Sequence, residues 1–499
     1  MSDTLASIKI FIDKYISKVH PYLFGQFIEH FPRQIYGGIY EEDSPFSDSY
    51  GFRLDVQEVL KVIKPSLLRW PGGNYTSGYH WRWGVGPKEE RSSRKNPHWE
   101  EFESHHFGTT EFVEYCSRIG AEPLICVGIG QDSNNPTMEE IIEWVKYCNF
   151  KKGEEAELRK RSGHESPLNV KWWGIGNECY GPWQIGYYKD GKEYGRDALK
   201  LINAMKKVDP SLKFVVVGED PTVNLKWNQQ LLSNDDVAKN VEVLSWHHYY
   251  QIRAKERASH RKATLDLKKV ERRLKRTIKL IKDTCQRINR ANLIKIAVDE
   301  WNEFGWEEIE IEKNALPEQY DLAHALYTAG FLNILIRLSD FVYMANYSPI
   351  VNTRGLIYVD KSGVLLRSSY YVYKLYRECA GGFSLQQEIK SPHLEDSNAL
   401  SLDISSVKMN DNLIYLFVIN RDSQDITTII NIDNFKVKSS KGKIITGNDL
   451  RSYNDQQNPF IISIKDLDVN ISGENLKFTF PKYSICLLYL SQKQKSIEE

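Results

Sequence analysis

Short apolar runs alternate with longer amphipathic stretches between residues 22 and 380, and this pattern constrains the fold more than any other feature of the chain. It predicts parallel strands joined by crossover helices. Runs such as Leu124-Ile125-Cys126-Val127 are continuously apolar, as expected of strands buried on both faces. Eight runs occupy residues 23–31, 66–70, 122–130, 170–178, 213–220, 242–250, 294–301 and 341–347. The sequence therefore predicts an α/β fold, a (β/α)8 TIM barrel with insertions.

The pattern changes after residue 380 to an alternation of period two, interrupted by turn residues. Segments 413–420, 426–432 and 477–480 predict strands of a C-terminal antiparallel β-sandwich. Segment 8–16 also has the pattern of a strand, and we expect it to join this sheet. The predicted organisation is an N-terminal strand in residues 1–20, the barrel in residues 21–380 and the sandwich in residues 381–499.

Charge and cysteine content narrow the class of protein. The chain has 66 basic and 66 acidic residues, so its net charge gives no reason to expect nucleic acid or a membrane as partner. No apolar stretch reaches the roughly 20 residues that a membrane span needs. Seven scattered cysteines show neither metal-ligand spacing nor a disulfide framework. Because residues 1–17 also lack the features of a signal peptide, we expect reduced thiols in a cytoplasmic protein.

A basic stretch, residues 253–290, is dense in Lys and Arg and carries leucines and isoleucines near helical spacing. It predicts one long amphipathic helix. Two interpretations are open: a basic surface for an acidic partner, or the solvated outer face of a barrel helix. The neutral net charge of the chain favours the second interpretation.

Polar residues at the carboxyl ends of the apolar runs are candidate active-site residues, because active sites of such barrels lie at the carboxyl ends of the strands. The fourth run ends in Asn177-Glu178 and the seventh in Asp299-Glu300-Trp301. One such glutamate is more often structural, but two meet the need of glycoside hydrolysis for a pair of carboxyl groups. Asn177 is placed to bind a sugar hydroxyl, and Trp301 is a candidate apolar wall.

Three further strand ends add to this cluster. The first run closes with Glu29-His30, the second leads from Arg69 to Asn74, and the sixth contains His247-His248-Tyr249. Arg69 and Tyr249 are suitable donors to keep a carboxylate nucleophile ionised. His247 is either a functional group or a hydrogen-bonded core histidine. His247 and His248 lack the further spaced ligands that a metal site requires, so we predict no metal site.

At these residues the sequence resembles glycoside hydrolase family 51, the α-L-arabinofuranosidases, from about residue 23 to residue 347. Several unlinked segments in the right order carry the resemblance. They are Phe24-Gly25-Gln26-Phe27-Ile28-Glu29-His30, Tyr36-Gly37-Gly38-Ile39-Tyr40, residues 69–74 with Ser77-Gly78-Tyr79, Gly176-Asn177-Glu178 with Gly181-Pro182-Trp183-Gln184-Ile185-Gly186, residues 245–250 and Asp299-Glu300-Trp301-Asn302.

The resemblance implies that Glu178 is the acid/base and Glu300 the nucleophile of a retaining hydrolase. It implies that Glu29, Asn74 and Asn177 bind sugar hydroxyls. Arg69, His247 and Tyr249 would surround the nucleophile, and Trp99 and Trp183 would form aromatic walls of the pocket. It further implies a homo-oligomer such as a hexamer, and no cofactor.

The chain departs from the family pattern at the eighth strand end. Where bacterial members usually carry Gln in an Ala-x-x-Ala-Gln-x-Val-Asn context, this sequence has Pro349, which cannot donate a side-chain hydrogen bond to a sugar. Asn346 is a candidate substitute from a nearby position. The departure bears on the sugar preference and leaves the reaction type unchanged.

The expected function is an exo-acting retaining hydrolase that releases terminal α-L-arabinofuranosyl residues from oligosaccharides derived from arabinan or arabinoxylan. One alternative is a retaining β-glycanase or β-xylosidase that uses the same two glutamates. A second alternative, from another class, is a non-catalytic carbohydrate-binding barrel. The presence of both glutamates and their donors favours an enzyme, since fold alone would not decide this.

Overall fold

The computed structural model describes residues 6–99, 102–251, 259–304, 320–395, 397–469, 471, 473 and 475–493. The first residues of the predicted basic helix, 253–258, lie outside the described residues. In the described part of the chain, no helix is both long and apolar enough to cross a membrane.

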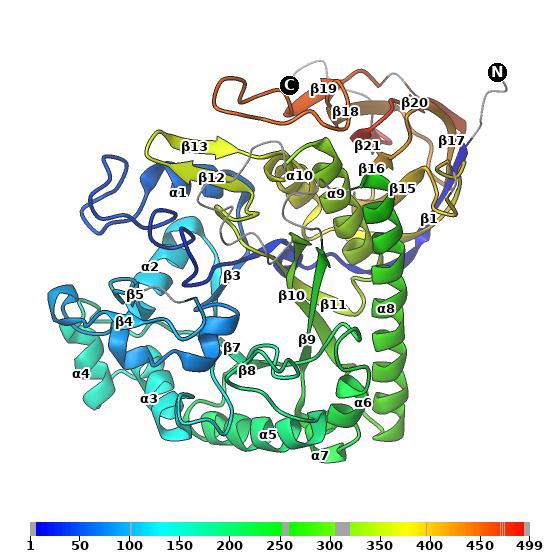
Figure 1. Ribbon diagram of the computed structural model, residues 1–499. Helices are drawn as coiled ribbons and strands as arrows, with labels where there is room; N and C mark the ends of the chain where they lie inside the picture. Colours follow the sequence, from blue (N-terminus) through cyan, green and yellow to red (C-terminus); the bar gives the residue numbers. More distant parts are fainter. Residues whose placement is uncertain are drawn as a thin grey trace.

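Eight parallel strands close into a barrel in the order β10-β11-β2-β3-β6-β7-β8-β9 (Figure 1), which confirms the predicted fold. The strands are β2 (Gly25–Phe27), β3 (Leu67–Trp70), β6 (Glu122–Val127), β7 (Trp172–Ile175), β8 (Lys213–Val216), β9 (Val243–Gln251), β10 (Lys295–Phe304) and β11 (Val342–Tyr347). Each of them overlaps one of the predicted apolar runs.

Helices surround the barrel and cover the outer face of its strands (Figure 1). Those described are α1 (Leu54–Ile63), α2 (Thr109–Ile119), α3 (Met138–Asn149), α4 (Glu154–Arg161), α5 (Gly191–Val208), α6 (Trp227–Leu232), α7 (Asp235–Asn240), α8 (His260–Arg287), α9 (Leu322–Arg337) and α10 (Ser368–Tyr376). Two short ribbons, β4 (Arg94–Lys95) with β5 (Phe102–Glu103) and β12 (Ile357–Asp360) with β13 (Gly363–Leu366), decorate the loops.

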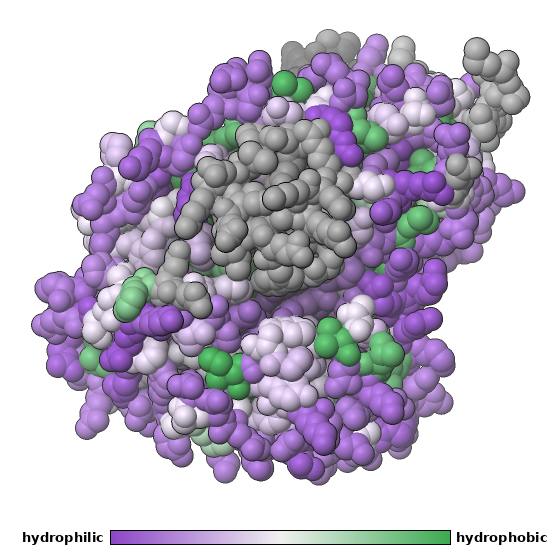
Figure 2. Space-filling model, in the orientation of Figure 1, coloured by the Kyte–Doolittle hydropathy of each residue, from purple (hydrophilic) through white to green (hydrophobic). Residues whose placement is uncertain are grey.

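The basic stretch forms α8, a single helix of 28 residues. Its buried side includes Leu267, Val270, Leu274 and Ile281, while hydrophilic residues cover the side of the molecule where α8 lies (Figures 1 and 2). This distribution is the one expected of a barrel helix with a solvated outer face.

The C-terminal region is a nine-stranded sheet in the order β19-β18-β21-β16-β15-β14-β1-β17-β20. Its strands are β1 (Ala6–Lys18), β14 (Phe383–Lys390), β15 (Leu402–Asn410), β16 (Leu413–Asn420), β17 (Ile426–Asp433), β18 (Ser439–Ile445), β19 (Ile464–Leu467), β20 (Asn475–Phe480) and β21 (Ser484–Ser491). β1 pairs antiparallel with β14 but parallel with β17, so the sheet is mixed where we expected a purely antiparallel one. The reason is that the inserted N-terminal strand comes from outside the antiparallel meander.

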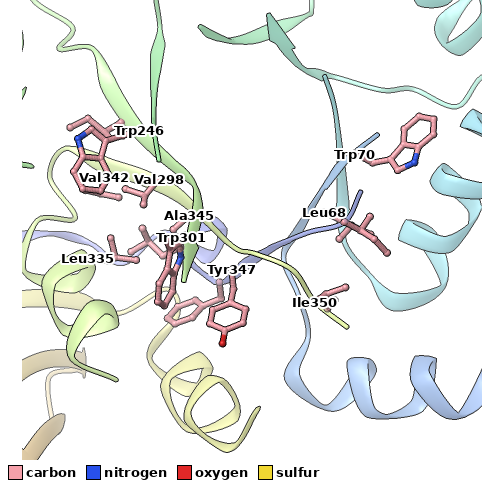
Figure 3. Close-up of a cluster of buried hydrophobic side chains, with 14 of the residues drawn as sticks. Leu68, Trp70, Trp246, Val298, Trp301, Leu335, Val342, Ala345, Tyr347 and Ile350 are labelled. Atoms are coloured by element: carbon pink, nitrogen blue, oxygen red, sulfur yellow. The ribbon is translucent and has the colours of Figure 1, made fainter. Parts of the chain in front are cut away.

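Two apolar layers hold the barrel. Inside, a ring of side chains fills the end where the strands begin; it comprises Leu67, Leu124, Trp172, Val215, Val243, Ala297 and Met344. Outside, a larger cluster packs the strands against the helices, and Figure 3 shows part of it, with Val298, Trp301, Ala345 and Tyr347 beside Leu335 of α9. The packed interior leaves the opposite end, where the strands finish, for polar side chains.

Candidate active site

Glu178 stands on a tight turn directly after β7. Gly176 has φ +87°, and a Cβ there would lie 2.6 Å from the sulfur of Cys179, so the turn requires glycine. Glu178 itself has φ +42°, in the left-handed region that non-glycine residues rarely adopt. Such a backbone is typical of residues held for function.

A β-bulge in β10 brings two neighbouring carboxylates to the same side. Ala297 pairs with Ser245 of β9, but the next pair is Glu300 with His247, so β10 has one extra residue. Asp299 receives a hydrogen bond of 2.6 Å from the hydroxyl of Ser245, and Glu300 reaches the mouth of the barrel. Without the bulge, alternation along the strand would send these carboxylates to opposite faces.

Glu300 is held by two donors on its two oxygens. Arg69 Nη1 donates to Oε1 at 2.6 Å, and the hydroxyl of Tyr249 donates to Oε2 at 2.7 Å. Arg69 is 1% exposed and also donates from Nη2 to Asn177 Oδ1 at 2.8 Å. A buried guanidinium and a phenol that both face this carboxylate stabilise its charged form.

Glu178 has different surroundings. Its Oε1 lies 3.0 Å from His247 Nδ1 and accepts a bond of 3.3 Å from the hydroxyl of Tyr180. Its Oε2 accepts from Trp183 Nε1 at 3.1 Å. Burial acts to raise the pKa of Glu178, but hydrogen bonding and the charge of His247 outweigh it and lower that pKa.

His247 lies between three carboxylates. Its Nε2 is 3.4 Å from Asp299 Oδ1, and its Nδ1 is 3.7 Å from Glu300 Oε1. Burial favours the neutral ring, but the charges of Glu300 and Asp299 raise the pKa of His247 to about 10. Both ring nitrogens thus face acceptors, which makes His247 and Glu178 a pair that shares one proton.

The two glutamates lie close together. Single atoms of Glu178, His247 and Glu300 all lie within 4.8 Å of one another. These three side chains have the donor types of a metal site, and the approach of the two carboxylates is also what covalent glycoside hydrolysis requires.

A pocket opens above this pair. Among the described residues it is lined by Phe27, Glu29, Phe31, Gln34, Gly73, Asn74, Glu178, Tyr249, Glu300, Ser348, Pro349 and Thr353. Gly73 lies close to the carboxylate, since a Cβ on it would be 3.3 Å from Glu300 Oε1. The pocket thus combines apolar walls with hydrogen-bonding groups, as sugar-binding sites require.

Glu29 is the third carboxylate of the pocket. It accepts from the backbone N–H of Tyr75 at 3.0 Å and from Trp99 Nε1 at 3.2 Å. Burial, together with the charge of Glu300, raises the pKa of Glu29 to about 7. Trp99 therefore contacts the site through Glu29, and its ring packs edge-on against Phe31 at 4.5 Å.

Two asparagines complete the predicted set. Asn74 lines the pocket, and its Oδ1 accepts from Gln184 Nε2. Asn177 is 1% exposed, and its Nδ2 has no hydrogen-bond partner among the described residues. A buried amide N–H without such a partner is suited to donate a hydrogen bond to an oxygen atom of a ligand.

The prediction that Trp301 forms an apolar wall of the pocket is wrong. It is fully buried, stacks on Phe331 at 4.2 Å, and lies beside Tyr347 in the outer layer of Figure 3, away from the pocket. Because neighbouring residues of a strand face opposite sides, the inward side chain of Glu300 sends Trp301 outward.

Asn346 is not among the described residues that line the pocket. Asn346 is fully buried, and its Oδ1 lies so close to Gly25 that a Cβ there would be 2.3 Å away. It therefore does not substitute for the glutamine that Pro349 replaces. His248, the neighbour of His247, lies 2.8 Å from Asp220 and 2.7 Å from Asp266.

Several residues of the site were not predicted from the sequence. Ser348 and Thr353 follow β11, and Gln34 donates from Nε2 to Thr353 Oγ1 at 3.3 Å while its Oε1 accepts from the N–H of Glu29. Their places depend on the paths of loops, for which the sequence gives no period or motif. Asp299 lies within a recognised motif, and the polar pair Asp299-Glu300 was a signal that could have revealed the bulge.

A (β/α)8 barrel with two neighbouring glutamates, Glu178 just after β7 and Glu300 within β10, is the arrangement typical of glycoside hydrolases. Two family models match the chain: one described as "Alpha-L-arabinofuranosidase 1 domain" over residues 59–266, and one described as "Alpha-L-arabinofuranosidase C-terminal domain" over residues 299–484. The chain belongs to glycoside hydrolase family 51, the α-L-arabinofuranosidases.

Relatives of full length support this membership. A probable α-L-arabinofuranosidase C of Aspergillus clavatus is 30% identical, over 97% of this chain and 96% of its own. An intracellular exo-α-(1→5)-L-arabinofuranosidase 1 of Bacillus subtilis is 28% identical, over 97% and 99%. The solved structure of a family 51 α-L-arabinofuranosidase from Thermotoga petrophila is 33% identical, over 97% and 99%, with a TM-score of 0.86.

Proposed function

We propose that this α-L-arabinofuranosidase releases terminal arabinofuranosyl residues by double displacement, with Glu300 as nucleophile and Glu178 as acid/base. The observation that carries the proposal is the approach of their carboxylate oxygens to within 4.8 Å. Retaining glycosidases have carboxyl groups about 5 to 5.5 Å apart, whereas inverting ones need roughly 6.5 to 9.5 Å to admit water. Carboxylate oxygens of Glu178 and Glu300 that approach this closely support a retaining arrangement over an inverting one.

In the first step Glu300 attacks the anomeric carbon while the bond to the leaving oxygen breaks and that oxygen takes a proton from Glu178. The proton comes from the pair that Glu178 forms with His247 across 3.0 Å. In the second step Glu178 removes a proton from water, the water oxygen bonds the anomeric carbon, and the ester to Glu300 breaks.

The donors around each carboxylate suit these roles. Arg69 and Tyr249 donate hydrogen bonds to the two oxygens of Glu300, and His247 lies within hydrogen-bond distance of Glu178. We assign sugar hydroxyls to Glu29, Asn74 and Asn177, because Glu29 and Asn74 line the pocket and Asn177 keeps an open amide donor. The exposed ring of Trp183 and, through Glu29, the indole of Trp99 are assigned to the rim of the pocket.

Substrate, compartment and assembly follow as further parts of the proposal. The expected substrates are oligosaccharides from arabinan or arabinoxylan, in keeping with the exo-acting relative of Bacillus subtilis. That relative is intracellular, and all seven cysteines of this chain are unpaired and buried, which supports a cytoplasmic site of action. A homo-oligomer such as a hexamer is expected from the family, and light scattering would measure it.

The test is turnover of aryl α-L-arabinofuranoside, β-D-xyloside and β-D-glucoside by the wild type and by Glu300→Ala. We expect strong hydrolysis of the arabinofuranoside that is lost in the variant, with Glu242→Ala, an exposed residue before β9, as the active control. With methanol added as the acceptor in place of water, NMR of the first-formed methyl glycoside should show the anomeric configuration of the substrate. Inverted product would refute double displacement, and preference for xyloside or glucoside would refute the sugar assignment.

A further inference from the structure

The hydroxyl of Tyr249 lies between the nucleophile and a serine. Tyr249 Oη is 2.7 Å from Glu300 Oε2 and 2.7 Å from Ser348 Oγ. A phenol has one proton, and an ionised carboxylate can only accept, so that proton belongs to the bond with Glu300. The second contact then requires Ser348 to donate its own proton to Tyr249 Oη. Two hydrogen bonds thus run in one direction, from Ser348 through Tyr249 to Glu300.

Ser348 is fixed in place by the strand that carries the nucleophile. Its N–H donates to the carbonyl of Trp301 at 3.2 Å, and its carbonyl accepts from Asn302 Nδ2 at 2.8 Å. Asn302 is fully buried and also donates to the carbonyl of Arg354 at 2.9 Å. Ser348 is 3% exposed, so little solvent competes for its hydroxyl. The serine is therefore held in register with Glu300, two residues before Asn302.

We infer that Ser348 is a positioning residue that acts through Tyr249 to speed the second step of the reaction, release of the sugar from Glu300. The inference rests on the proposed double displacement. Chains of hydrogen bonds that run in one direction polarise one another, so the donation by Ser348 makes Tyr249 a stronger donor. A stronger donor stabilises the anionic form of the Glu300 carboxylate.

The two steps respond oppositely to that stabilisation. In the first step the carboxylate of Glu300 gives an electron pair to the anomeric carbon and loses its charge. In the second step the bond from that carbon to the Glu300 oxygen breaks, the electron pair returns to Glu300, and water supplies the new oxygen while Glu178 takes the proton. A donor that favours the anion therefore accelerates release and gives no advantage to attack.

The test measures the two steps separately, by rapid quench of wild type and Ser348→Ala with an aryl α-L-arabinofuranoside that has a good leaving group. We expect the rate constant of release to fall about three- to tenfold, the size of one modest hydrogen bond, while the rate constant of attack is unchanged or rises. Ser348→Thr keeps the hydroxyl and should restore release. Ser339→Ala, a buried serine whose hydroxyl has no partner among the described residues, is the matched control and should change neither constant.

A double-mutant cycle decides whether Ser348 acts through Tyr249. In the background of Tyr249→Phe the relay is already broken, so Ser348→Ala should have no further effect on release. Equal loss of both rate constants, or effects of the two substitutions that add, would show a merely structural role and overturn the inference. Failure of the underlying mechanism has a different signature: Glu300→Ala would keep its turnover, or no glycosyl-enzyme would form in the wild type.

Discussion

The two ends of the barrel are built from the same strands and have opposite chemistry. Along β9, Val243 belongs to the apolar ring at the start of the strands, whereas His247 and Tyr249 contact Glu178 and Glu300, the two carboxylates of the proposed mechanism. Residues of the same parity face the same side, so four residues, roughly 13 Å, separate the sealed end from the site. The starting end has a wider hollow, but among the described residues that line it Glu242 is the one carboxylate, and it lies 3.4 Å from Lys206.

This contrast indicates that stability and catalysis are carried by different layers of one barrel. The apolar ring has no polar group to position and can be packed for density. At the other end Arg69, Asp299 and Glu300 are buried together at 1 to 4% exposure, an arrangement that costs desolvation free energy and is kept for reactivity. Substitutions at the two ends should therefore separate loss of activity from loss of stability.

The largest effect is expected for Glu300→Gln, which keeps the size of the side chain and removes the proposed nucleophile. We expect kcat on an aryl arabinofuranoside to fall by about 10⁴-fold, since the carboxylate proposed to form the ester is lost. Thermal unfolding should stay within a few degrees of the wild type. Glu242→Gln at the opposite end should retain full activity, and a comparable loss there would contradict the separation of the two ends.

The second prediction concerns the sealed end. Leu124→Ala should lower the free energy of unfolding by about 3 kcal/mol, because the fully buried ring has little room to collapse around the cavity. Urea denaturation measures this loss. At a temperature where the variant remains folded, kcat and KM should match the wild type within about twofold. A selective fall in kcat without loss of stability would instead couple this layer to the site.

The sequence was sufficient to predict the strands and helices that have a periodic pattern of apolar residues. Every barrel strand overlaps a predicted apolar run, and the convergence of the strand ends was enough to group Glu178, Glu300 and Arg69. Ends of strands were less accurate: run 170–178 contains β7, but β7 finishes at Ile175 because the chain turns at Gly176.

The remainder depends on backbone detail that the sequence pattern does not encode. The bulge in β10 decides that both Asp299 and Glu300 face the interior while Trp301 packs outward. Simple alternation from Glu300 would have predicted the outward side of Trp301. The loop residues Ser348 and Thr353 reach the pocket through tertiary contacts, for which no local signal exists.

The third prediction uses the pKa of Glu29, raised by burial from 4.5 to about 7. Between these values the folded protein holds a proton that the unfolded chain has lost, so stability should fall as pH rises through this window. Glu29→Gln does not titrate. It should therefore unfold like the wild type at pH 4 and become relatively more stable up to pH 8, by at most about 3 kcal/mol. If the unfolding free energies of the two proteins changed with pH in parallel across this range, the raised pKa of Glu29 would be contradicted.

The smallest effect is expected for Trp301→Phe, next to the nucleophile but on the other face of β10. Trp301 Nε1 has no hydrogen-bond partner among the described residues, so the substitution loses ring volume against Phe331 and no polar contact. We expect a loss of about 1 kcal/mol in unfolding free energy, and kcat and KM within about twofold of the wild type. Trp183→Phe is the matched comparison, because it removes the N–H that donates to Glu178 and should lower kcat severalfold without loss of stability. If Trp301→Phe lowered activity more than Trp183→Phe, the outer face of β10 would have to be assigned to the site. The alternation of side chains along β10 would then not separate packing residues from site residues.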